Sequence, residues 1–364
     1  MKILFFIGSL QAGGKERRLV ELLSYLNSKE SYDILLVLAT DKIEYPKFQY
    51  LNIKHIDLHK RANSKSFFPM IQLLNICARF RPDVIHTWGS LQTLYSVPSS
   101  LLLAIPILNN QIADVFTHRS LLSRLMNSIN FFFSSIICSN SYAGLVAYGV
   151  SESKKSVVIS NGIDISRFSE LDLTNAVKKR FLIHTSYAVV MAASYSKNKD
   201  WNRFYELASY VTKIDNNISF IGVGSITDSE IYSGLLDRSS DNPNIIIQGR
   251  TSEVENLVNA CDIGVLFSTK GEGISNTILE YLALGKAVIV DELGGSSEFI
   301  DNNVNGFFTT GKTISDIGNL IIELINTPSK RIAVGNRGKE TVLSRFSLPV
   351  MGEQFEKLYR RIVK

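Results

Sequence analysis

The sequence contains few cysteines and no long hydrophobic run: its 364 residues include three cysteines, eight prolines and two tryptophans. Cys77, Cys138 and Cys261 are odd in number and lie in apolar surroundings, which argues against a disulfide framework and indicates reduced, buried thiols. The apolar stretch Leu101–Leu108 is too short to span a bilayer. The N-terminal apolar run ends at Gly8 without a small-residue cleavage site. We therefore expect a cytoplasmic protein with no secretory leader.

A strong excess of one charge is also missing. Lys and Arg number 39 against 34 Asp and Glu, which gives a formal net charge of +5. No dense basic run or array of basic and aromatic residues is present, so we expect no nucleic-acid partner. In one stretch, Arg119 and Arg124 precede Phe131–Phe133, Ile136 and Ile137, which is compatible with a peripheral contact on the inner face of an anionic membrane. A buried helix followed by a core strand is the favoured interpretation of this stretch.

Short apolar strand candidates alternate with helical patterns along the chain, and this alternation predicts parallel strands with crossover helices. The strand candidates are Ile3–Ile7, Ile34–Leu38, Val84–Thr87, Ile105–Leu108, Ile136–Ser139, Val157–Ile159, Val189–Ala193, Ile218–Val223, Ile245–Gln248, Ile263–Phe267 and Ala287–Val290. The helical patterns include Leu19–Leu26, Phe67–Phe80, Trp201–Val211, Glu230–Leu235, Val254–Ala260, Thr277–Leu284 and Met351–Val363.

The pattern restarts after a polar segment near Asn161–Lys179, and the chain is longer than one hydrophobic core usually allows. We therefore predict an α/β protein with two Rossmann-like, doubly wound domains that face a central cleft. The first domain is expected over residues 1–165, completed by a C-terminal helix over 347–364, and the second over 166–346.

A glycine turn at residues 8–14 follows the first strand candidate and precedes a helical pattern. It is not a nucleoside-triphosphate loop, because five residues rather than four separate Gly8 from Gly14 and Lys15 is followed by Glu16 rather than Ser or Thr. The positions of Gly8, Gly13 and Gly14 do not fit a dinucleotide fingerprint either. A helix start that faces the phosphates of another nucleotide and a plain tight turn both stay open on this stretch alone.

The segment Lys270–Ile300 carries the densest signal. Glu272 lies in a loop after a strand candidate, and Glu280 lies eight positions later in the second turn of a helix that begins near Asn276. A loop carboxylate accepts hydrogen bonds from hydroxyls, and the N–H groups of residues 273–277 face an anion at the same point. Such a site suits a polyhydroxylated anion. In the alternative interpretation both glutamates are solvated surface acids.

These residues resemble the signature of the retaining glycosyltransferases of family 4, which have the two-domain GT-B fold. The signature is a glutamate, seven intervening residues, a second glutamate, a helix end, a strand and a double glycine. It is matched by Glu272, Glu280, Gly285, Ala287–Val290 and Gly294–Gly295. Further similarity covers nearly the whole chain, at Gly13–Gly14 with Glu16–Arg17, Pro82–His86, Asn161–Asp164, and Phe346–Ser347 before a terminal helix with Tyr359.

The resemblance implies a role for each matching residue. Glu272 lies against the donor sugar, and Lys199 supplies positive charge to the departing diphosphate, so both are catalytic candidates. Glu280 accepts hydrogen bonds from the ribose hydroxyls. The backbone N–H groups that approach sugar and diphosphate belong to Gly273, Ile274, Ser275, Asn276, Gly13 and Gly14.

Two departures from the family pattern leave positions open. Ser194 stands where the family has an arginine that binds the diphosphate, and Lys197 or Arg250 is a candidate substitute for it. Lys197 is equally well explained as a solvated loop lysine. A His-Asp pair near the donor sugar is reduced to Asp114, with His118 one helical turn further on. His86 is a candidate for the acceptor pocket, although a core histidine is the favoured interpretation.

The resemblance implies transfer of a hexose-type sugar from a nucleoside-diphosphate donor, UDP-linked above all, to a hydroxyl of a glycan or lipid-linked acceptor in surface polysaccharide biosynthesis. The anomeric configuration would be retained. We expect no cofactor and no metal ion, because the sequence has no Asp-x-Asp motif and its histidines lack zinc-like spacing. The alternatives are a sugar-nucleotide epimerase of the same fold, a non-catalytic two-lobed sugar-binding protein, and a nicotinamide dehydrogenase, for which Asp41 follows the second strand.

Overall fold

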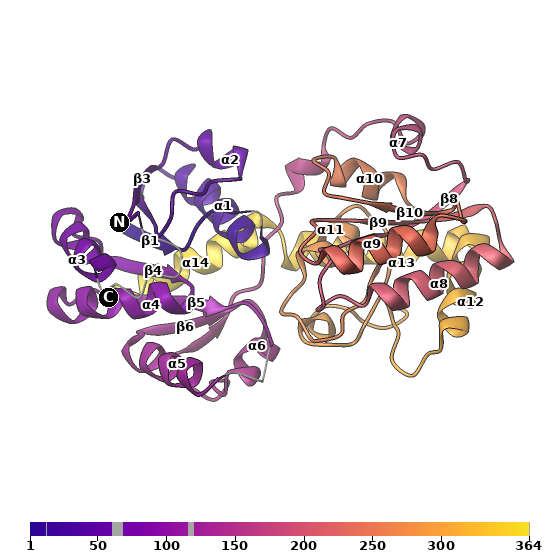
Figure 1. Ribbon diagram of the computed structural model, residues 1–364. Coiled ribbons are helices and arrows are strands. Elements are labelled where there is room, and N and C mark those ends of the chain that lie inside the picture. Colours follow the sequence, from indigo (N-terminus) through magenta and orange to yellow (C-terminus); the bar gives the residue numbers. More distant parts are fainter. Residues whose placement is uncertain (12, 60–67, 116–119, 364) are drawn as a thin grey trace. The chain divides into compact units, whose positions relative to one another are not determined.

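The computed structural model describes residues 1–364 except 12, 60–67, 116–119 and 364. The chain forms two compact units, one made of Met1–Gly162 and Leu348–Lys364, the other of Ile163–Ser347. We call them the N-terminal unit and the C-terminal unit and describe each by itself (Figure 1). Each is built on one parallel sheet with alternating helices, so the predicted α/β class with two doubly wound domains is confirmed.

The N-terminal unit contains a seven-stranded sheet in the order β3-β2-β1-β4-β5-β6-β7. Strands β1 and β2 are buried along all but their first residue, because helices cover both faces of the sheet. The elements are β1 (Lys2–Ile7), α1 (Gly14–Asn27), β2 (Asp33–Leu38), α2 (Pro46–Gln49), β3 (Lys54–Asp57), α3 (Phe68–Phe80), β4 (Val84–Trp88), α4 (Ser90–Leu103), β5 (Ile107–Ile112), α5 (Leu121–Phe133), β6 (Ile136–Ser139), α6 (Tyr142–Ala147), β7 (Ser156–Val158) and α14 (Leu348–Ile362).

Helix α14 returns the end of the chain to this unit. Its side chains Phe355 and Tyr359 are fully buried and belong to the same apolar cluster as Leu19 and Leu23 of α1. A Cβ atom on Gly352 would lie 2.3 Å from the Tyr25 ring, so the glycine allows α14 to pack closely on α1. His86 is also buried here, and its Nδ1 lies 2.8 Å from the Tyr359 hydroxyl.

The C-terminal unit contains a six-stranded parallel sheet in the order β10-β9-β8-β11-β12-β13. Its strands are apolar and mostly buried, as expected for a sheet with helices on both faces. The elements are the 3-10 turn η1 (Ile165–Phe168), α7 (Thr174–Arg180), β8 (Tyr187–Ala192), α8 (Trp201–Ile214), β9 (Ile218–Val223), α9 (Ser229–Ser239), β10 (Ile245–Gln248), α10 (Val254–Ala260), β11 (Ile263–Leu266), α11 (Asn276–Ala283), β12 (Ala287–Val290), the 3-10 turn η2 (Gly295–Glu298), β13 (Phe307–Phe308), α12 (Ile314–Asn326) and α13 (Pro328–Arg345).

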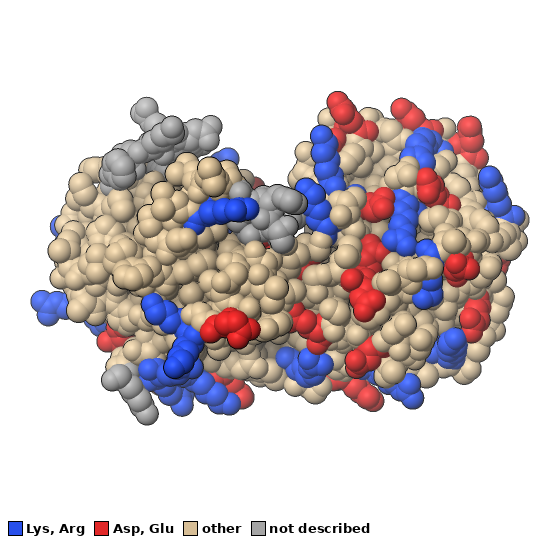
Figure 2. All heavy atoms as spheres, turned by 90° about the horizontal axis from the view of Figure 1, so that it is seen from below, with Lys and Arg blue, Asp and Glu red and all other residues tan. Residues whose placement is uncertain are grey.

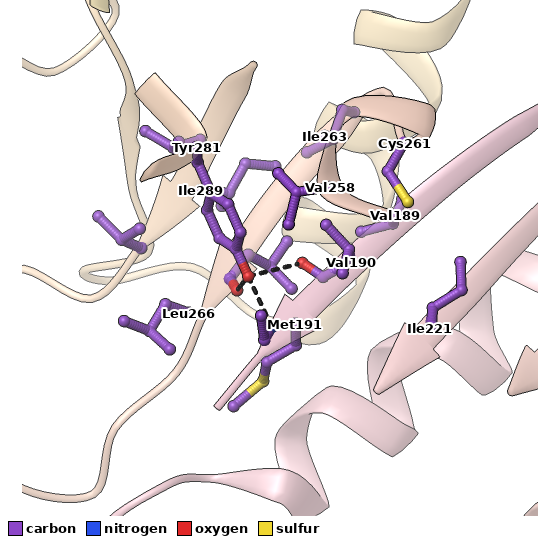
Figure 3. Packing of buried hydrophobic residues seen from close by; sticks show 14 of the residues in the cluster. Val189, Val190, Met191, Ile221, Val258, Cys261, Ile263, Leu266, Tyr281 and Ile289 are labelled. Carbon is purple, nitrogen blue, oxygen red and sulfur yellow. Dashed lines mark hydrogen bonds between the residues drawn. The ribbon is translucent and has the colours of Figure 1, made fainter. Parts of the chain in front are cut away.

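Tyr281 fixes helix α11 on this sheet. Figure 3 shows its ring among the apolar side chains of β8 and β11, with the hydroxyl directed at the strand backbones. The hydroxyl accepts a hydrogen bond of 2.6 Å from the Ala192 N–H and lies 3.4 Å from the Val190 carbonyl oxygen. Burial raises the pKa of this phenol, so it stays a neutral donor and acceptor. The neighbouring residue, Glu280, is thereby held in a defined orientation.

The structure corrects the expectation for the stretch around Phe131. Strand β6 is buried, as predicted for Ile136 and Ile137, but α5 is not a buried helix, since Phe132 is 74% exposed. Asn127 and Asn130 are the buried residues of α5, and Phe131 is partly buried against the cluster of Ile112, Ile137 and Leu145. Arg119, part of the same prediction, lies outside the described residues. Among the helices that the structure describes, none is long and apolar enough to span a membrane.

Candidate active site

Lys199 and Glu272 lie at the ends of two neighbouring strands of the C-terminal unit. Lys199 follows β8 and Glu272 follows β11, and these parallel strands are hydrogen-bonded to each other. Because the carboxyl ends of parallel strands meet at one edge of a sheet, the two loops run together. Lys199 forms a bridge with Ser268, and the Asp200 N–H donates to the Phe267 carbonyl oxygen at 3.0 Å.

The side chains of these two residues form an ion pair. The Lys199 Nζ contacts Glu272 Oε1, and the Ser268 hydroxyl lies 3.3 Å from the same oxygen. The lysine side chain is 12% exposed and the glutamate side chain 32% exposed. Burial lowers the pKa of Lys199 to about 8. The Glu272 carboxylate favours the charged ammonium and opposes this shift of the pKa.

Two stacked aromatic rings hold the loop that carries Lys199. Tyr195 and Trp201 stack with their ring centroids 4.3 Å apart, and the Trp201 indole donates to the Ser194 carbonyl oxygen at 2.9 Å. The Tyr195 hydroxyl donates to the Gln248 carbonyl oxygen at 2.8 Å. The loop between β8 and α8 is therefore fixed at both ends, and the ammonium of Lys199 has a defined position.

The double glycine Gly294–Gly295 packs against the backbone of Glu272. Gly294 has φ +63°, and a Cβ atom there would come within 1.9 Å of the Glu272 carbonyl oxygen. The Gly295 N–H donates to that same oxygen at 2.7 Å. Both glycines are thus needed for close approach of the two loops, and they define the backbone that carries the Glu272 carboxylate.

Helix α11 begins next to Glu272. A small pocket is lined by Glu272, Gly273, Ser275 and Ile278 of this segment, and by Asp291 after β12. Ser275 is the residue before the helix, and its side chain makes no capping hydrogen bond to the helix backbone. The structure therefore brings together Glu272 and the predicted backbone segment, which continues through Ile274 and Asn276 at the helix start.

Glu280 is buried on α11, so its interpretation as a solvated surface acid is wrong. The residue is 6% exposed, and its Oε1 lies 3.2 Å from Nη2 of Arg167. Arg167 also forms an ion pair with Glu255, at the start of α10. The two carboxylates thus share one guanidinium, which offsets the cost of burying Glu280.

The candidate substitutes for the missing arginine lie at different places. Lys197 lines a pocket together with Lys199 and Thr269, but its side chain is 85% exposed and its Nζ is 3.9 Å from Asp228. Arg250 is exposed after β10, two strands away from β8 in the sheet. At Ser194, the hydroxyl lies 3.2 Å from the Ser196 hydroxyl. Lys199 is the most deeply placed of these cations.

The remaining candidates belong to the N-terminal unit. Gly13 precedes α1 with an extended backbone, and its carbonyl oxygen accepts a hydrogen bond of 2.6 Å from the Tyr45 hydroxyl. The role of Gly13 and Gly14 in a nucleotide site stays a prediction. The Tyr148 hydroxyl lies 3.5 Å from the Asp114 carboxylate. His118 lies outside the described residues.

Two groups around the site were missed from the sequence. Arg167 pairs with Glu280. In the sequence, the only feature that could have pointed to Arg167 is its place three residues after the Asn161–Asp164 segment. Asp291 accepts a hydrogen bond of 2.8 Å from the Ser268 N–H and pairs with Arg203 at 2.7 Å. Asp291 thereby fixes the loop between β11 and Glu272, and its position directly after β12 was the available signal.

Comparisons with known proteins agree with this description. Residues 174–341 match the family model described as Glycosyl transferases group 1. The chain is 25% identical over 208 residues to the capsular polysaccharide biosynthesis glycosyltransferase CapM of Staphylococcus aureus, over 56% of this chain and 54% of that protein. It is 27% identical over 220 residues to the N,N'-diacetylbacillosaminyl-diphospho-undecaprenol alpha-1,3-N-acetylgalactosaminyltransferase of Campylobacter jejuni. This match covers 59% of this chain and 57% of that protein. The chain thus spans a little over half the length of these two relatives.

Solved structures match over nearly the whole chain. Anabaena HepE in complex with UDP-glucose has a TM-score of 0.83 at 18% identity and covers 99% of this chain and 100% of its own. A UDP-GlcNAc 2-epimerase of Neisseria meningitidis has a lower TM-score of 0.67 at 13% identity, and the match covers 99% of this chain and 100% of the epimerase chain. At these identities the likeness establishes the fold alone. Residues 174–341, within the C-terminal unit, thus carry the similarity to the Glycosyl transferases group 1 family, and the fold of the chain is GT-B.

Proposed function

We propose that this protein is a retaining glycosyltransferase that moves a sugar from a nucleoside-diphosphate donor, a UDP-sugar, to a hydroxyl of a glycan or lipid-linked acceptor in surface polysaccharide biosynthesis. The observation that carries the proposal is the partly buried Lys199–Glu272 pair beside the start of α11. The names of CapM and of the Campylobacter transferase support the setting, and the UDP-glucose in HepE supports the donor. We place the reaction on the cytoplasmic side of the membrane.

In this proposal, Lys199 and Glu272 separate when the donor binds. The diphosphate takes the place of the carboxylate beside the Lys199 ammonium, and Glu272 then accepts hydrogen bonds from sugar hydroxyls. Glu280 accepts hydrogen bonds from the ribose hydroxyls at the other end of the donor. Since a ligand that replaces an existing partner leaves no buried charge alone, the site is stable both with and without the donor.

The chemical step breaks the bond between the anomeric carbon and the diphosphate oxygen. Negative charge then develops on that oxygen, where the Lys199 cation and the N–H groups at the start of α11 stabilise it. The acceptor hydroxyl attacks the anomeric carbon from the face that the diphosphate leaves, and its proton passes to a leaving-phosphate oxygen. We propose that these groups act without a metal ion; turnover that disappears in excess chelator would contradict this.

The experiment that tests the function is a thermal-shift panel of nucleotide sugars on the purified protein. A ligand at a hundredfold excess over its dissociation constant stabilises the folded state by about 2.7 kcal/mol, so the correct donor stands out as a raised Tm. We expect a UDP-sugar to give the largest rise. The proposal would be wrong if no nucleotide sugar raised the Tm and a nicotinamide cofactor did.

Incubation with donor alone separates the proposed transferase from an epimerase, since the fold is shared with a UDP-GlcNAc 2-epimerase. A transferase that lacks an acceptor hydrolyses or converts the nucleotide sugar only slowly. Rapid consumption of the donor, with a changed or freed sugar, would favour the epimerase instead. Donor binding without consumption, whatever acceptor is supplied, would favour a sugar-binding protein.

The charge of Lys199 predicts how activity depends on pH. Only the protonated lysine stabilises the leaving diphosphate, so kcat/KM should fall as the pH rises through the pKa of Lys199 in the free enzyme, which burial lowers and Glu272 raises. Replacing Glu272 by Gln removes the negative charge that favours the ammonium, which lowers the pKa of Lys199 further. The alkaline limb of the kcat/KM profile should therefore move to lower pH in E272Q. A limb that stays in place would show that another group titrates.

A further inference from the structure

Helix α5 buries two asparagines, Asn127 and Asn130, and leaves four of its large apolar residues exposed. On the inner side, Asn127 accepts a hydrogen bond of 2.8 Å from the Gln111 amide, and Asn130 donates to Gln111 Oε1 at 2.8 Å. Asn130 also donates to the Ser90 carbonyl oxygen at 2.8 Å. A surface helix ordinarily turns its apolar stripe to the core. Here the side-chain amides anchor the helix to the unit, and the apolar stripe is left for another surface.

The outer stripe of α5 follows helical spacing. Leu121 is 83% exposed, Leu125 is 59% exposed and Phe132 is 74% exposed, and Leu122 beside them is 76% exposed. We call these four residues with Arg124 the α5 face. Residues four apart lie one above the other on a helix, so Leu121 and Leu125 form one ridge, and Phe132 extends it by two turns.

The neighbouring helices add apolar surface. Helix α4 contacts both α3 and α5, and helix α6 follows β6 in the same unit. Of the 22 exposed large apolar side chains in the described part of the chain, 11 lie on α3 to α6, while the nine of the C-terminal unit are spread over its helices and loops. These additional residues are Phe68, Ile71, Leu101, Leu102, Leu103, Tyr142 and Val146. The exposed apolar side chains are thus concentrated on one unit, and those of α5 lie next to helix α4.

Basic residues outnumber acidic ones around the α5 face, where Glu152 is an exposed acid two residues before Lys154. From Val115 to Ser151 the sequence contains no Asp or Glu. Arg124 lies on the α5 face, Lys154 is exposed in the loop before β7, and the Lys155 ammonium donates to the Phe132 carbonyl oxygen at 2.9 Å. In Figure 1, α5 lies along the lower side of the N-terminal unit, and Figure 2 shows that side with broad uncharged areas and with both basic and acidic residues at their edges.

We propose that the α5 face rests on an anionic phospholipid membrane. Leucine and phenylalanine side chains enter the boundary between headgroups and acyl chains, while the nearby cations pair with lipid phosphates. The asparagine anchors keep α5 attached to the sheet while its outer side is in lipid. This contact does not depend on which donor the enzyme uses, and it would bring the protein to acceptors carried by membrane lipids.

Vesicle sedimentation tests the proposal on the full-length protein without any nucleotide sugar. The wild type should bind vesicles that contain phosphatidylglycerol, bind phosphatidylcholine vesicles more weakly, and lose affinity as salt is added. The double variant Leu125→Ser, Phe132→Ser should bind phosphatidylglycerol vesicles at least about tenfold more weakly. The charge variant Arg124→Glu, Lys154→Glu should lose the preference for phosphatidylglycerol while keeping its weak binding to phosphatidylcholine.

A matched control is offered by two exposed apolar residues of the C-terminal unit. Leu173 is 82% exposed and Ile332 is 54% exposed, so Leu173→Ser, Ile332→Ser removes similar apolar surface and should leave vesicle binding unchanged. Equal Tm values for both double variants would exclude misfolding.

Wild-type protein that stays in the supernatant, or binding that survives Leu125→Ser, Phe132→Ser, would overturn the proposal. A dimer in sedimentation velocity that this variant abolishes would assign the α5 face to a second copy. Vesicle binding without any response to nucleotide sugars would refute only the proposed function.

Discussion

Replacing Lys199 by Ala is expected to lower kcat by about a hundredfold to a thousandfold, which is the usual loss when one preorganised group that stabilises developing charge is removed. The Lys199 side chain is 12% exposed, so water does not readily take over the role of its ammonium. Negative charge on the diphosphate grows as its bond to the sugar breaks. Steady-state kinetics should therefore show a much smaller change in donor affinity than in turnover.

A control for this variant lies on the same helix that follows Lys199. Lys213 is exposed in the last turn of α8, and Lys213→Ala removes the same charge from the surface of the unit. Its kcat should match the wild type. If Lys199→Ala weakened donor binding and turnover by the same factor, the lysine would only bind the donor, and its proposed role in the chemical step would be wrong.

Replacing Glu280 by Ala should weaken donor binding by about 1.5–3 kcal/mol, or about tenfold to 150-fold in Kd, because the ribose hydroxyls lose a charged partner in a buried site. Turnover at saturating donor should change less, since the ribose is remote from the bond that breaks. Isothermal titration with the nucleotide sugar identified by the thermal-shift panel measures the effect directly.

Glu255 provides the matched control for Glu280. Both carboxylates pair with Arg167, so Glu255→Ala and Glu280→Ala each remove one partner from the same guanidinium. Their effects on the Tm should therefore be similar. Only Glu280→Ala should weaken the donor complex. Equal losses of donor affinity in both variants would mean that the acids act through Arg167, and that Glu280 does not itself contact the ribose.

The alternation of strands and helices could be predicted from the sequence because strands buried on both faces appear as short apolar runs. The runs Ile136–Ser139 and Ala287–Val290 have the bounds of β6 and β12. Two strands were not predicted, because they do not form apolar runs of sufficient length. Strand β3 lies at the edge of its sheet with two exposed residues, and β13 is only two residues long.

Buried polar residues explain the other differences. Strand β5 was expected to end at Leu108, but it continues through Asn109, Asn110 and Gln111, which are buried and polar. The Gln111 amide bonds to α5, which satisfies its polar atoms inside the unit. Helix α4 was not expected, because Pro98 lies inside it and buried Thr93, Ser96 and Ser99 interrupt its apolar pattern. No rule based on hydrophobic periodicity detects such segments.

The candidate site was predictable where it follows from strand ends and not where it depends on distant contacts. Lys199 and Glu272 follow adjacent parallel strands, so their contact agrees with a simple rule of topology. Arg167 is 113 residues away from Glu280 in the sequence, and nothing local connects the two. The outward apolar face of α5 was likewise hidden, because periodicity shows that a stripe exists but not which side of the helix is turned to the core.

The place of α14 in the fold has a consequence for how the protein is made on the ribosome. The N-terminal unit is synthesised first, but Phe355 and Tyr359, which belong to its core, are added only after residues 163–347. The later unit is therefore free to fold while the earlier one still exposes the apolar side that α14 will cover. During that interval chaperones can bind the exposed apolar side of the nascent chain. The yield of folded protein should therefore depend strongly on chaperones, even if the finished protein is stable.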